Sequence, residues 1–485
     1  MPSIPEYPTM TISFRFLAAG CLALAASVHS SLACPGDVDD DQRVNVNDLL
    51  EVIGGWGACP PSPTACPADI DASGAVGVDD LLVVLSGWGD CPDAGDAPQR
   101  IVAYYIEWGI SGRDYQPMDI PADKITHINY AFANIGTDGR IALGDPYAAI
   151  DKYYPGDSWD QPYRGTYHQI NNVLRGQYPH LKTLISVGGW TWSGRFSDIA
   201  LTTTSRETFA ESCVEFIRTY NFDGVDIDWE YPVCCGLAGN TYRPEDKQNY
   251  TLLLQELRRQ LDSAADEDDR EYLLTIAAPA GYDKIANLEP DGIAEACDWI
   301  NVMTYDYHGA WDMTATNHHS KLFPNPDDPG AEEVAERYNA RSAIQTFMEA
   351  GVPASELVLG VPFYGRAWGG VAADNDGLFQ PGSIVPPGTW DDWSSGSTGV
   401  NDWFEIETFI ASGEYTRHWD EHSKVPWLYS PTRHGGHFVS YDDEESMQYK
   451  VDFARELGLG GFMFWEITAD RNETLLDILQ SARTP

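Results

Sequence analysis

The sequence predicts a protein of the α/β class: a (β/α)8 barrel, or TIM barrel, with an inserted α+β subdomain, preceded by a small α-helical unit. Three observations predict this organisation. Strand-like apolar runs alternate eight times with helical stretches after residue 100, a duplicated acidic motif precedes them, and an export-type apolar segment comes first. Because 485 residues exceed the usual size of one domain, we divide the chain into segments 1–33, 34–91, 92–99 and 100–485.

The chain is strongly acidic. Its 74 Asp and Glu residues outnumber 30 Lys and Arg residues, which gives a net charge of −44 at pH 7. Such a charge disfavours nucleic acids and anionic membranes as partners. Apolar residues make up 43% of the chain and charged residues only 21%, so we expect a substantial core rather than a disordered acidic chain.

The first 33 residues have the pattern of a bacterial-type secretion signal. Arg15 precedes the apolar run FLAAGCLALAASV, and Ser31-Leu32-Ala33 offers small residues for cleavage. This run is too short to span a membrane, and no later segment is long enough to do so. The pattern predicts a secreted, extracellular protein; Cys34, directly after the cleavage site, leaves a lipoprotein anchor as an alternative.

Two stretches in segment 34–91 repeat each other at an offset of 32 residues: CPGDVDDDQRVNVNDLLEVIGGWGACP and CPADIDASGAVGVDDLLVVLSGWGDCP. Each spaces oxygen-bearing side chains as an EF-hand-type calcium loop does, although Gln42 stands where such a loop has Gly and Asp replaces the final Glu. The candidate calcium ligands are Asp37, Asp39, Asp41, Asn45 and Asp48 in the first loop, and Asp69, Asp71, Ser73 and Asp80 in the second.

A duplicated half EF-hand with Asp at the twelfth loop position resembles a dockerin module over residues 34–91. The resemblance implies that Ca²⁺ binds to both loops and that the module docks onto a cohesin-type partner protein. Calcium that only folds this small unit is the alternative.

Four cysteines bracket the two repeats, and export would permit disulfides. Pairing within each repeat, Cys34–Cys59 and Cys66–Cys91, is the simplest expectation, and pairing crossed between the repeats is the alternative. The remaining downstream cysteines lack zinc-type spacing and stay unassigned: Cys213, Cys234, Cys235 and Cys297.

After a linker at 92–99, apolar runs read as eight strands separated by helical stretches such as 246–261 and 444–458. The expected strands lie within 100–108, 124–135, 181–190, 222–232, 271–280, 299–309, 356–368 and 460–467. The interval between the last two is too long for one βα unit, so we expect an inserted subdomain at about 367–440.

The expected fourth strand, FDGVDIDWEYP, carries acids where a buried strand should be apolar. Side chains alternate in a strand, so Asp226, Asp228 and Glu230 all face the barrel interior and Asp223, with the other parity, is a structural acid. Three neighbouring carboxyl groups cannot all ionise cheaply, which keeps a proton on Glu230 for use as a general acid. A metal site and purely structural acids are the alternatives.

This D-x-x-D-x-D-x-E pattern resembles that of glycoside hydrolase family 18. Further matches are SVGGW (186–190), MTYDYHG (303–309), GVPFYGR (360–366) and GGFMFWE (460–466), and the resemblance covers residues 100–485. It implies a retaining enzyme without a protein nucleophile, in which the 2-acetamido group of the substrate attacks the anomeric carbon.

The family resemblance assigns a role to each acid. Glu230 protonates the glycosidic oxygen, Asp228 hydrogen-bonds the acetamido N–H and Asp226 shares a proton with Asp228. Tyr305 holds the acetamido group, and no cofactor is needed for catalysis. Substrate-lining positions carried over from the family are Tyr104, Phe132, Gly189, Trp190, Met303, Asp306, Tyr364, Arg366 and Trp465, with core packing as the alternative for each aromatic.

The resemblance therefore implies a secreted chitinase with a monomeric catalytic domain, acting on chitin or chitooligosaccharides. One alternative is an endo-β-N-acetylglucosaminidase that cuts N-glycans. Another is a chitin-binding lectin on the same barrel, which the presence of Glu230 disfavours.

Overall fold

The computed structural model describes residues 38, 43–44, 46–59, 66–70, 75–86, 89–90 and 100–483. The chain forms two compact units, Met1–Gly89 and Asp90–Pro485. The expected signal (1–33) and linker (92–99) lie outside the described residues, as do Cys34, Cys91 and the candidate ligands Asp37, Asp39, Asp41, Asn45, Asp71 and Ser73.

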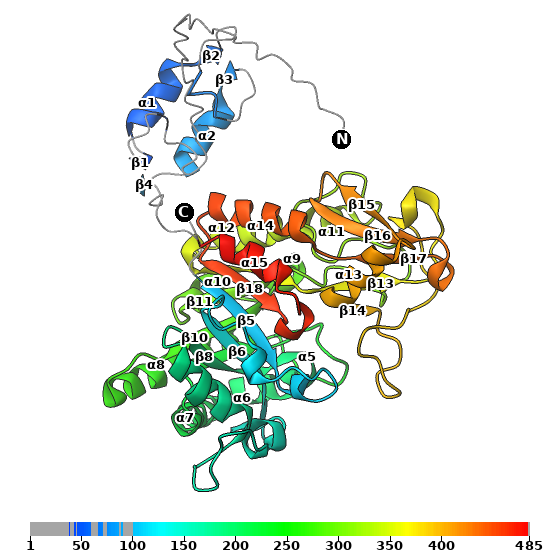
Figure 1. Ribbon diagram of the computed structural model, residues 1–485. Coiled ribbons are helices and arrows are strands. Elements are labelled where there is room, and N and C mark those ends of the chain that lie inside the picture. The colour runs from blue at the N-terminus through cyan, green and yellow to red at the C-terminus, as the bar shows by residue number, and fades with distance from the viewer. Residues whose placement is uncertain are drawn as a thin grey trace, which may run out of the picture. The chain divides into compact units, whose positions relative to one another are not determined.

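A closed barrel of parallel strands forms the centre of the larger unit, which confirms the predicted (β/α)8 fold (Figure 1). The barrel strands are β5 (Arg100–Ile106), β6 (His127–Ile135), β8 (Lys182–Gly188), β9 (Gly224–Asp228), β10 (Leu273–Pro279), β11 (Trp299–Met303), β12 (Leu357–Pro362) and β18 (Gly461–Trp465). Pairing of β5 with both β18 and β6 closes the ring, and β7 (Ile141–Ala142) adds antiparallel to β6.

Helices follow the barrel strands along the chain, and α7 and α8 pack against each other beside β9 and β10 (Figure 1). Their bounds are α3 (Gly165–His168), α4 (Arg175–Gln177), α5 (Gly189–Trp192), α6 (Phe196–Ala200), α7 (Thr203–Tyr220), α8 (Asp246–Asp268), α9 (Tyr282–Ile285), α10 (Pro290–Ala294), α11 (Glu332–Arg337), α12 (Ala340–Glu349), α14 (Glu444–Glu456) and α15 (Thr474–Ser481). Two of them contain the predicted helical stretches 246–261 and, to within two residues, 444–458. No helix of the described residues is long and apolar enough to cross a membrane.

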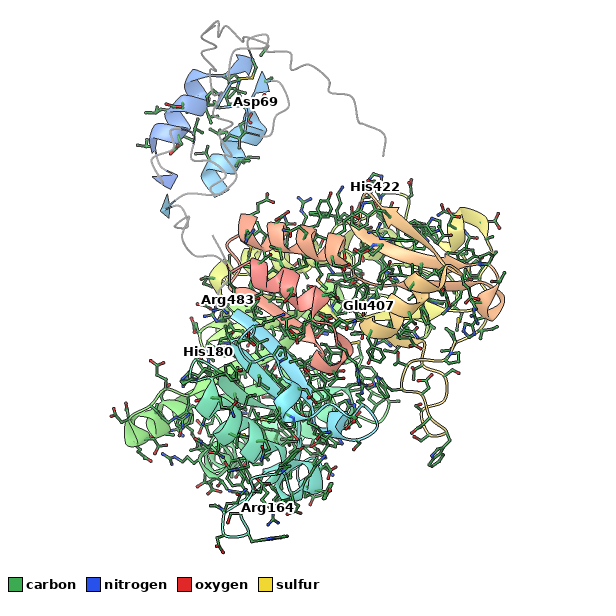
Figure 2. The ribbon with its side chains drawn as sticks, viewed as in Figure 1. Asp69, Arg164, His180, Glu407, His422 and Arg483 are labelled. Carbon is green, nitrogen blue, oxygen red and sulfur yellow. A yellow bond between two sulfur atoms is a disulfide. The ribbon has the colours of Figure 1, made fainter. Side chains whose placement is uncertain are left out.

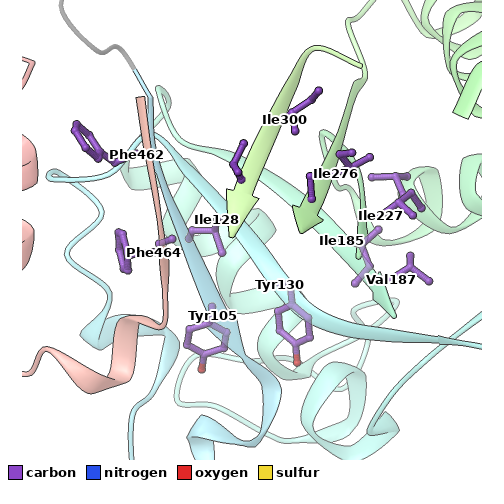
Figure 3. Close-up of a cluster of buried hydrophobic side chains, with 14 of the residues drawn as sticks. Tyr105, Ile128, Tyr130, Ile185, Val187, Ile227, Ile276, Ile300, Phe462 and Phe464 are labelled. Carbon is purple, nitrogen blue, oxygen red and sulfur yellow. The ribbon is translucent and has the colours of Figure 1, made fainter. Parts of the chain in front are cut away.

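Alternation along the strands separates two interiors. One set of side chains packs outward under the helices, and Figure 3 shows the buried residues Tyr105, Ile128, Tyr130, Ile185, Val187, Ile227, Ile276, Ile300, Phe462 and Phe464 of this layer. A second, smaller apolar cluster fills the barrel interior, with Tyr104 and Met463 among its members. Burying each large apolar side chain contributes about 1.5–3 kcal/mol, so this layered core fixes the strand register that positions the interior polar groups.

An antiparallel five-stranded sheet adjoins the barrel strand β12 in sequence. Its order is β14 (Val400–Asp402), β13 (Tyr364–Trp368), β17 (His437–Ser440), β16 (Val425–Ser430) and β15 (Thr416–Asp420), and α13 (Trp403–Ser412) packs on β13 and β14. Figure 2 shows the side chains of this region, with Glu407 labelled on α13 and His422 between β15 and β16.

The connection from β11 to β12 also packs on this sheet, which the sequence did not indicate. His318 Nε2 lies 3.0 Å from Asp420 Oδ2, and the backbone N–H of His319 donates to Ser440 Oγ at 2.9 Å. Residues 316–321 of this connection are all polar although they are buried, and the contacts of His318 and His319 depend on partners far away in sequence.

The smaller unit pairs two helices, α1 (Val46–Gly54) and α2 (Val78–Ser86). Two-residue strands accompany them: β1 (Arg43–Val44) pairs with β4 (Gly89–Asp90), and β2 (Gly57–Ala58) with β3 (Ala75–Val76). Asp48 and Asp80 are buried at equivalent positions of the two repeats and accept hydrogen bonds of 2.6 Å from the N–H groups of Val38 and Ile70. The internal repeat of the sequence is therefore a repeat of structure.

Cys59 is bonded to Cys66, so the expected pairing within each repeat is wrong for these two cysteines, and the crossed alternative holds for them. Cys59 directly follows β2, whose pairing with β3 brings the two repeats together and leaves the Cα atoms 5.9 Å apart, within the normal reach of a disulfide. Cys234 and Cys235 form a second disulfide, whereas Cys213 and Cys297 are buried free thiols.

Candidate active site

Strand β9 delivers two acids into the barrel interior and a third to its rim. Asp226 and Asp228 are buried, and their neighbours Val225 and Ile227 pack outward in the helix-facing core. The strand ends at Asp228, before the end of the expected run 222–232, so Glu230 lies just beyond it and is only half-buried. The three predicted acids are therefore placed in succession toward the carboxyl end of the barrel.

Asp226 is surrounded by hydrogen-bond donors from four other strands of the barrel. They are Tyr104 Oη at 2.7 Å, Ser186 Oγ at 2.7 Å, Thr275 Oγ1 at 2.6 Å and Asn301 Nδ2 at 3.4 Å. Burial raises the pKa of Asp226, and these four donors oppose that rise because they favour the charged carboxylate. Of the three acids, Asp226 is the one best prepared to carry charge.

Asp228 and Glu230 both retain protons more strongly than ordinary carboxyl groups. Burial, together with the charges of Glu230 and Asp226, raises the pKa of Asp228 well above its usual range. Its Oδ1 atom has no hydrogen-bond partner among the described residues. Burial, with a further contribution from Asp306, raises the pKa of Glu230 from 4.5 to about 7. Glu230 is thus a carboxylic acid that holds its proton near neutral pH, as a general acid must.

Both backbone groups of Glu230 are anchored. Its N–H donates to Ser193 Oγ at 2.8 Å, and its carbonyl oxygen accepts from Asn240 Nδ2 at 3.3 Å. Neither Ser193 nor Asn240 was predicted, because isolated polar residues in loops carry no recognisable pattern. Ser186, Thr275 and Asn301 did carry a signal: each is a polar residue within an apolar strand run, at the parity that faces the interior.

Asp306 forms an ion pair beside the acids. Arg366 contacts both of its oxygens, at 2.8 Å and 2.6 Å, and Tyr364 donates to Oδ1 at 2.7 Å. Burial would raise the pKa of Asp306, but the Arg366 guanidinium holds it well below its usual range, so Asp306 stays charged. Tyr305 precedes Asp306, lies edge-on to Tyr364 at 6.3 Å and donates to Met463 Sδ at 3.6 Å.

Aromatic rings form the floor of this region. Trp465, at the end of β18, stacks on Phe132 with ring centroids 5.7 Å apart and lies 5.5 Å from Tyr104 and 6.4 Å from Trp108. Non-proline cis peptide bonds precede Phe132 and follow both Glu230 and Trp465. Met303 belongs to the same apolar cluster. Tyr104, Phe132, Met303 and Trp465, which come from four different strands, therefore lie together in space.

The Gly188-Gly189 pair explains why the SVGGW motif needs glycine. Both residues have positive φ, 108° and 72°, and a Cβ on Gly188 would lie 2.3 Å from the carbonyl oxygen of Asp228. On Gly189 a Cβ would lie 2.7 Å from the Phe132 ring. The turn allows the chain to pass close to the acids and leaves Trp190 47% exposed at the rim.

Asp223 lies at the opposite end of β9 from Glu230. Its carboxylate contacts Arg175 Nη1 at 2.5 Å and Arg270 Nη2 at 2.7 Å and accepts the Thr183 N–H at 2.9 Å. These contacts join segments on the far side of the barrel from the rim, as expected of a structural acid.

Comparison with known proteins identifies the family. The sequence model for glycosyl hydrolases family 18 matches residues 100–470 of this chain. Chitinase A1 of Niallia circulans is 46% identical over 420 residues, which are 79% of this chain and 58% of that protein. Chitinase 1 of Aphanocladium album is 37% identical over 372 residues, 76% of this chain and 81% of that protein.

Solved structures lead to the same family. Chitinase ChiA74 from Bacillus thuringiensis superimposes with a TM-score of 0.75 at 41% identity, covering 79% of this chain and 69% of that one. The catalytic domain of chitinase B from Arthrobacter TAD20 superimposes with a TM-score of 0.73 at 30% identity, covering 81% of this chain and 97% of that one.

Proposed function

Because the chain belongs to glycosyl hydrolase family 18, and is therefore a glycoside hydrolase, we propose that it is a chitinase that cleaves β-1,4 linkages between N-acetylglucosamine units. The observation that carries the proposal is the line of three acids with unequal protonation, Asp226, Asp228 and Glu230, next to the aromatic floor around Trp465. The names of the similar proteins, which are chitinases, support this substrate class.

Glu230 would act first as the acid and then as the base. Its raised pKa supplies a proton to the glycosidic oxygen, and the resulting carboxylate later activates water. The 2-acetamido carbonyl of the substrate would attack the anomeric carbon and form an oxazolinium ion, so the product retains its configuration.

Asp228 would orient the acetamido group of the substrate. Its Oδ1, without a partner among the described residues, is available to the substrate N–H, and Tyr305 would hold the acetamido group from the other side. The four donors around Asp226 stabilise its charge, and a charged Asp226 allows Asp228 to keep or pass the shared proton as the oxazolinium forms. None of these steps needs a cofactor.

The remaining predicted positions would bind the sugar chain. Trp465 offers a ring face to the sugar at the cleavage point, and the half-exposed Trp190 offers another at the rim. The Asp306–Arg366 pair fixes the polar wall beside Tyr364, while Tyr104, Phe132, Gly189 and Met303 shape the space around the floor.

Product analysis tests the proposal. Purified full-length protein should release chitooligosaccharides from colloidal chitin and split chitohexaose into products whose new reducing ends first appear as the β-anomer. Release of glycans from a glycoprotein with no action on chitin would instead establish an endo-β-N-acetylglucosaminidase. Binding of chitin without any product would leave the lectin alternative.

For the N-terminal unit we propose calcium binding and docking onto a cohesin-type partner. The buried carboxylates of Asp48 and Asp80, at matching positions of the two repeats, fit an oxygen-ligand site for a hard cation. Each helix also exposes apolar side chains at helical spacing, Val46, Leu50 and Ile53 on α1 and Val78 and Leu82 on α2. Such a repeated apolar face suits a protein partner.

Calorimetric titration of the full-length protein with CaCl2 tests the cation site. We expect saturable binding that an Asp48→Asn/Asp80→Asn variant loses while chitin hydrolysis is unchanged. Absence of calcium binding by the wild-type chain would contradict the ligand assignment, and a cohesin pull-down in calcium, with EDTA as control, tests docking separately.

We further propose secretion after cleavage near Ala33, which N-terminal sequencing of the exported protein would check.

A further inference from the structure

The segment that leaves Glu230 turns back onto the backbone of that residue. Gly236 approaches so closely that a Cβ there would lie 2.2 Å from the carbonyl oxygen of Glu230. Four residues later, Asn240 donates to the same oxygen at 3.3 Å. The conformation of residues 231–240 therefore determines how the Glu230 peptide is held.

Two residues in this segment adopt the left-handed region of φ although neither is glycine. Val233 has a φ of 72° and Cys235 a φ of 71°. The region is unfavourable for L-residues and most of all for a β-branched one such as valine. Such a conformation persists only where the surroundings enforce it, and it concentrates at functional sites.

The disulfide between Cys234 and Cys235 lies at this point. It closes a small ring that contains the peptide bond between the two residues, so the dipeptide loses the rotations that an open chain would have. The N–H of Cys234 donates to the Pro232 carbonyl at 2.8 Å, and Asn287 Nδ2 approaches Cys234 Sγ at 3.6 Å, which ties the ring to the segment after α9.

We propose that the Cys234–Cys235 disulfide is a positioning device for the general acid. In this assignment, which rests on the proposed function, the ring enforces the left-handed backbone at Cys235 and thereby brings Gly236 and Asn240 against the Glu230 carbonyl. Ser193 accepts the N–H of Glu230 in the preceding peptide unit, so the backbone of Glu230 is fixed between two anchors. Neither cysteine touches the reacting atoms, and their effect passes through the orientation of Glu230.

Two double variants separate the ring from the conformation that it enforces. Cys234→Ser/Cys235→Ser should lower kcat on chitohexaose by about tenfold or more, because a carboxyl group displaced by a fraction of an ångström loses its alignment with the glycosidic oxygen. KM should change little. Cys234→Ser/Cys235→Gly should recover most of kcat, because glycine adopts a φ of 71° without a side-chain penalty.

Further readouts distinguish positioning from general loss of structure. Thermal unfolding and chitohexaose affinity, measured in a Glu230→Gln background, should match between the serine and glycine variants. A serine double variant with wild-type kcat, or equal losses of kcat in both variants, would contradict the proposal. Complete alkylation of both cysteines in the unreduced native enzyme would also contradict it.

Reduction of the wild-type enzyme provides an independent test. Cys235 is exposed, so tris(2-carboxyethyl)phosphine should reach the disulfide. The disulfide takes two electrons from the phosphine and two protons from water to give two thiols, and the oxygen of that water forms the phosphine oxide. We expect reversible loss of kcat, and a Cys59→Ser/Cys66→Ser variant controls for reduction in the N-terminal unit. If the untreated wild type fails to hydrolyse chitohexaose, the proposed function fails; if it is active but insensitive to reduction and to the serine substitutions, only the positioning role fails.

Discussion

The two ends of strand β9 hold the same kind of side chain in opposite electrostatic surroundings. At its start, Asp223 contacts the guanidinium groups of Arg175 and Arg270. At its end, no Lys or Arg nitrogen of the described residues comes within 4.0 Å of Asp226, Asp228 or Glu230. One end neutralises a carboxylate with cations, whereas the other leaves carboxyl groups to compete for protons.

This difference explains how one strand can serve stability at one end and the proposed chemistry at the other. A buried carboxylate beside arginines stays charged and links distant segments of the chain. Buried carboxyl groups without cations hold protons instead, and neutral donors such as Thr275 and Ser186 decide which of them carries the charge. Substitutions at the two ends should therefore fail in different ways.

The largest expected effect comes from Glu230→Gln, which keeps the shape of the side chain and removes its proton transfer. We expect kcat on chitohexaose to fall about a thousandfold, close to 4 kcal/mol in the barrier, because the amide of glutamine cannot transfer a proton to the glycosidic oxygen. Chitohexaose binding and thermal stability should persist. Turnover within tenfold of wild type would show that a different group donates the proton.

The next effect tests the other end of the strand. Asp223→Ala leaves Arg175 and Arg270 without their shared partner, so we expect a loss of about 3 kcal/mol in the free energy of unfolding, measured by urea denaturation. The value falls at the low end of the range for buried ion pairs because Arg270 is 32% exposed. The folded fraction should keep wild-type kcat, and Asp223→Asn, which retains the hydrogen bond from Thr183, should lose less stability.

The comparison also separates what the sequence could reveal from what it could not. Strand parity alone placed Asp226 and Asp228 inside the barrel and Asp223 apart from them, because alternation is a local property. The sequence did not reveal Arg175 and Arg270 as partners of Asp223, or Asn240 as an anchor of Glu230. Those contacts depend on segments that the fold brings together, and nothing in their local spacing marks them. The Cys59–Cys66 bond crosses between the repeats, because nearness along one repeat does not determine which cysteines the fold brings together.

The smallest effect concerns the pH dependence of kcat/KM. Burial raises the pKa of Glu230 from 4.5 to about 7, and in the proposed mechanism Glu230 donates its proton only while protonated. Activity should therefore decline above pH 7, by roughly tenfold per pH unit. Burial also raises the pKa of Glu107 and Glu466 from 4.5 to about 7. Ionisation of these two acids therefore lowers the stability of the fold as the pH rises from 4.5 to about 7, and it causes no further loss above about pH 7.

A decline above pH 7 can therefore be attributed to Glu230 if circular dichroism shows that the fold is unchanged there. Asp306 provides the matched perturbation, because its charge raises the pKa of Glu230. Asp306→Asn removes that charge and leaves the Arg366 cation nearby, so the basic limb of the profile should move to lower pH. Asp223→Asn, at the opposite end of the strand, should leave the limb in place. A limb that moves equally in both variants would mean that the protonation of Glu230 is set by the charge of the whole protein and not by its immediate neighbours.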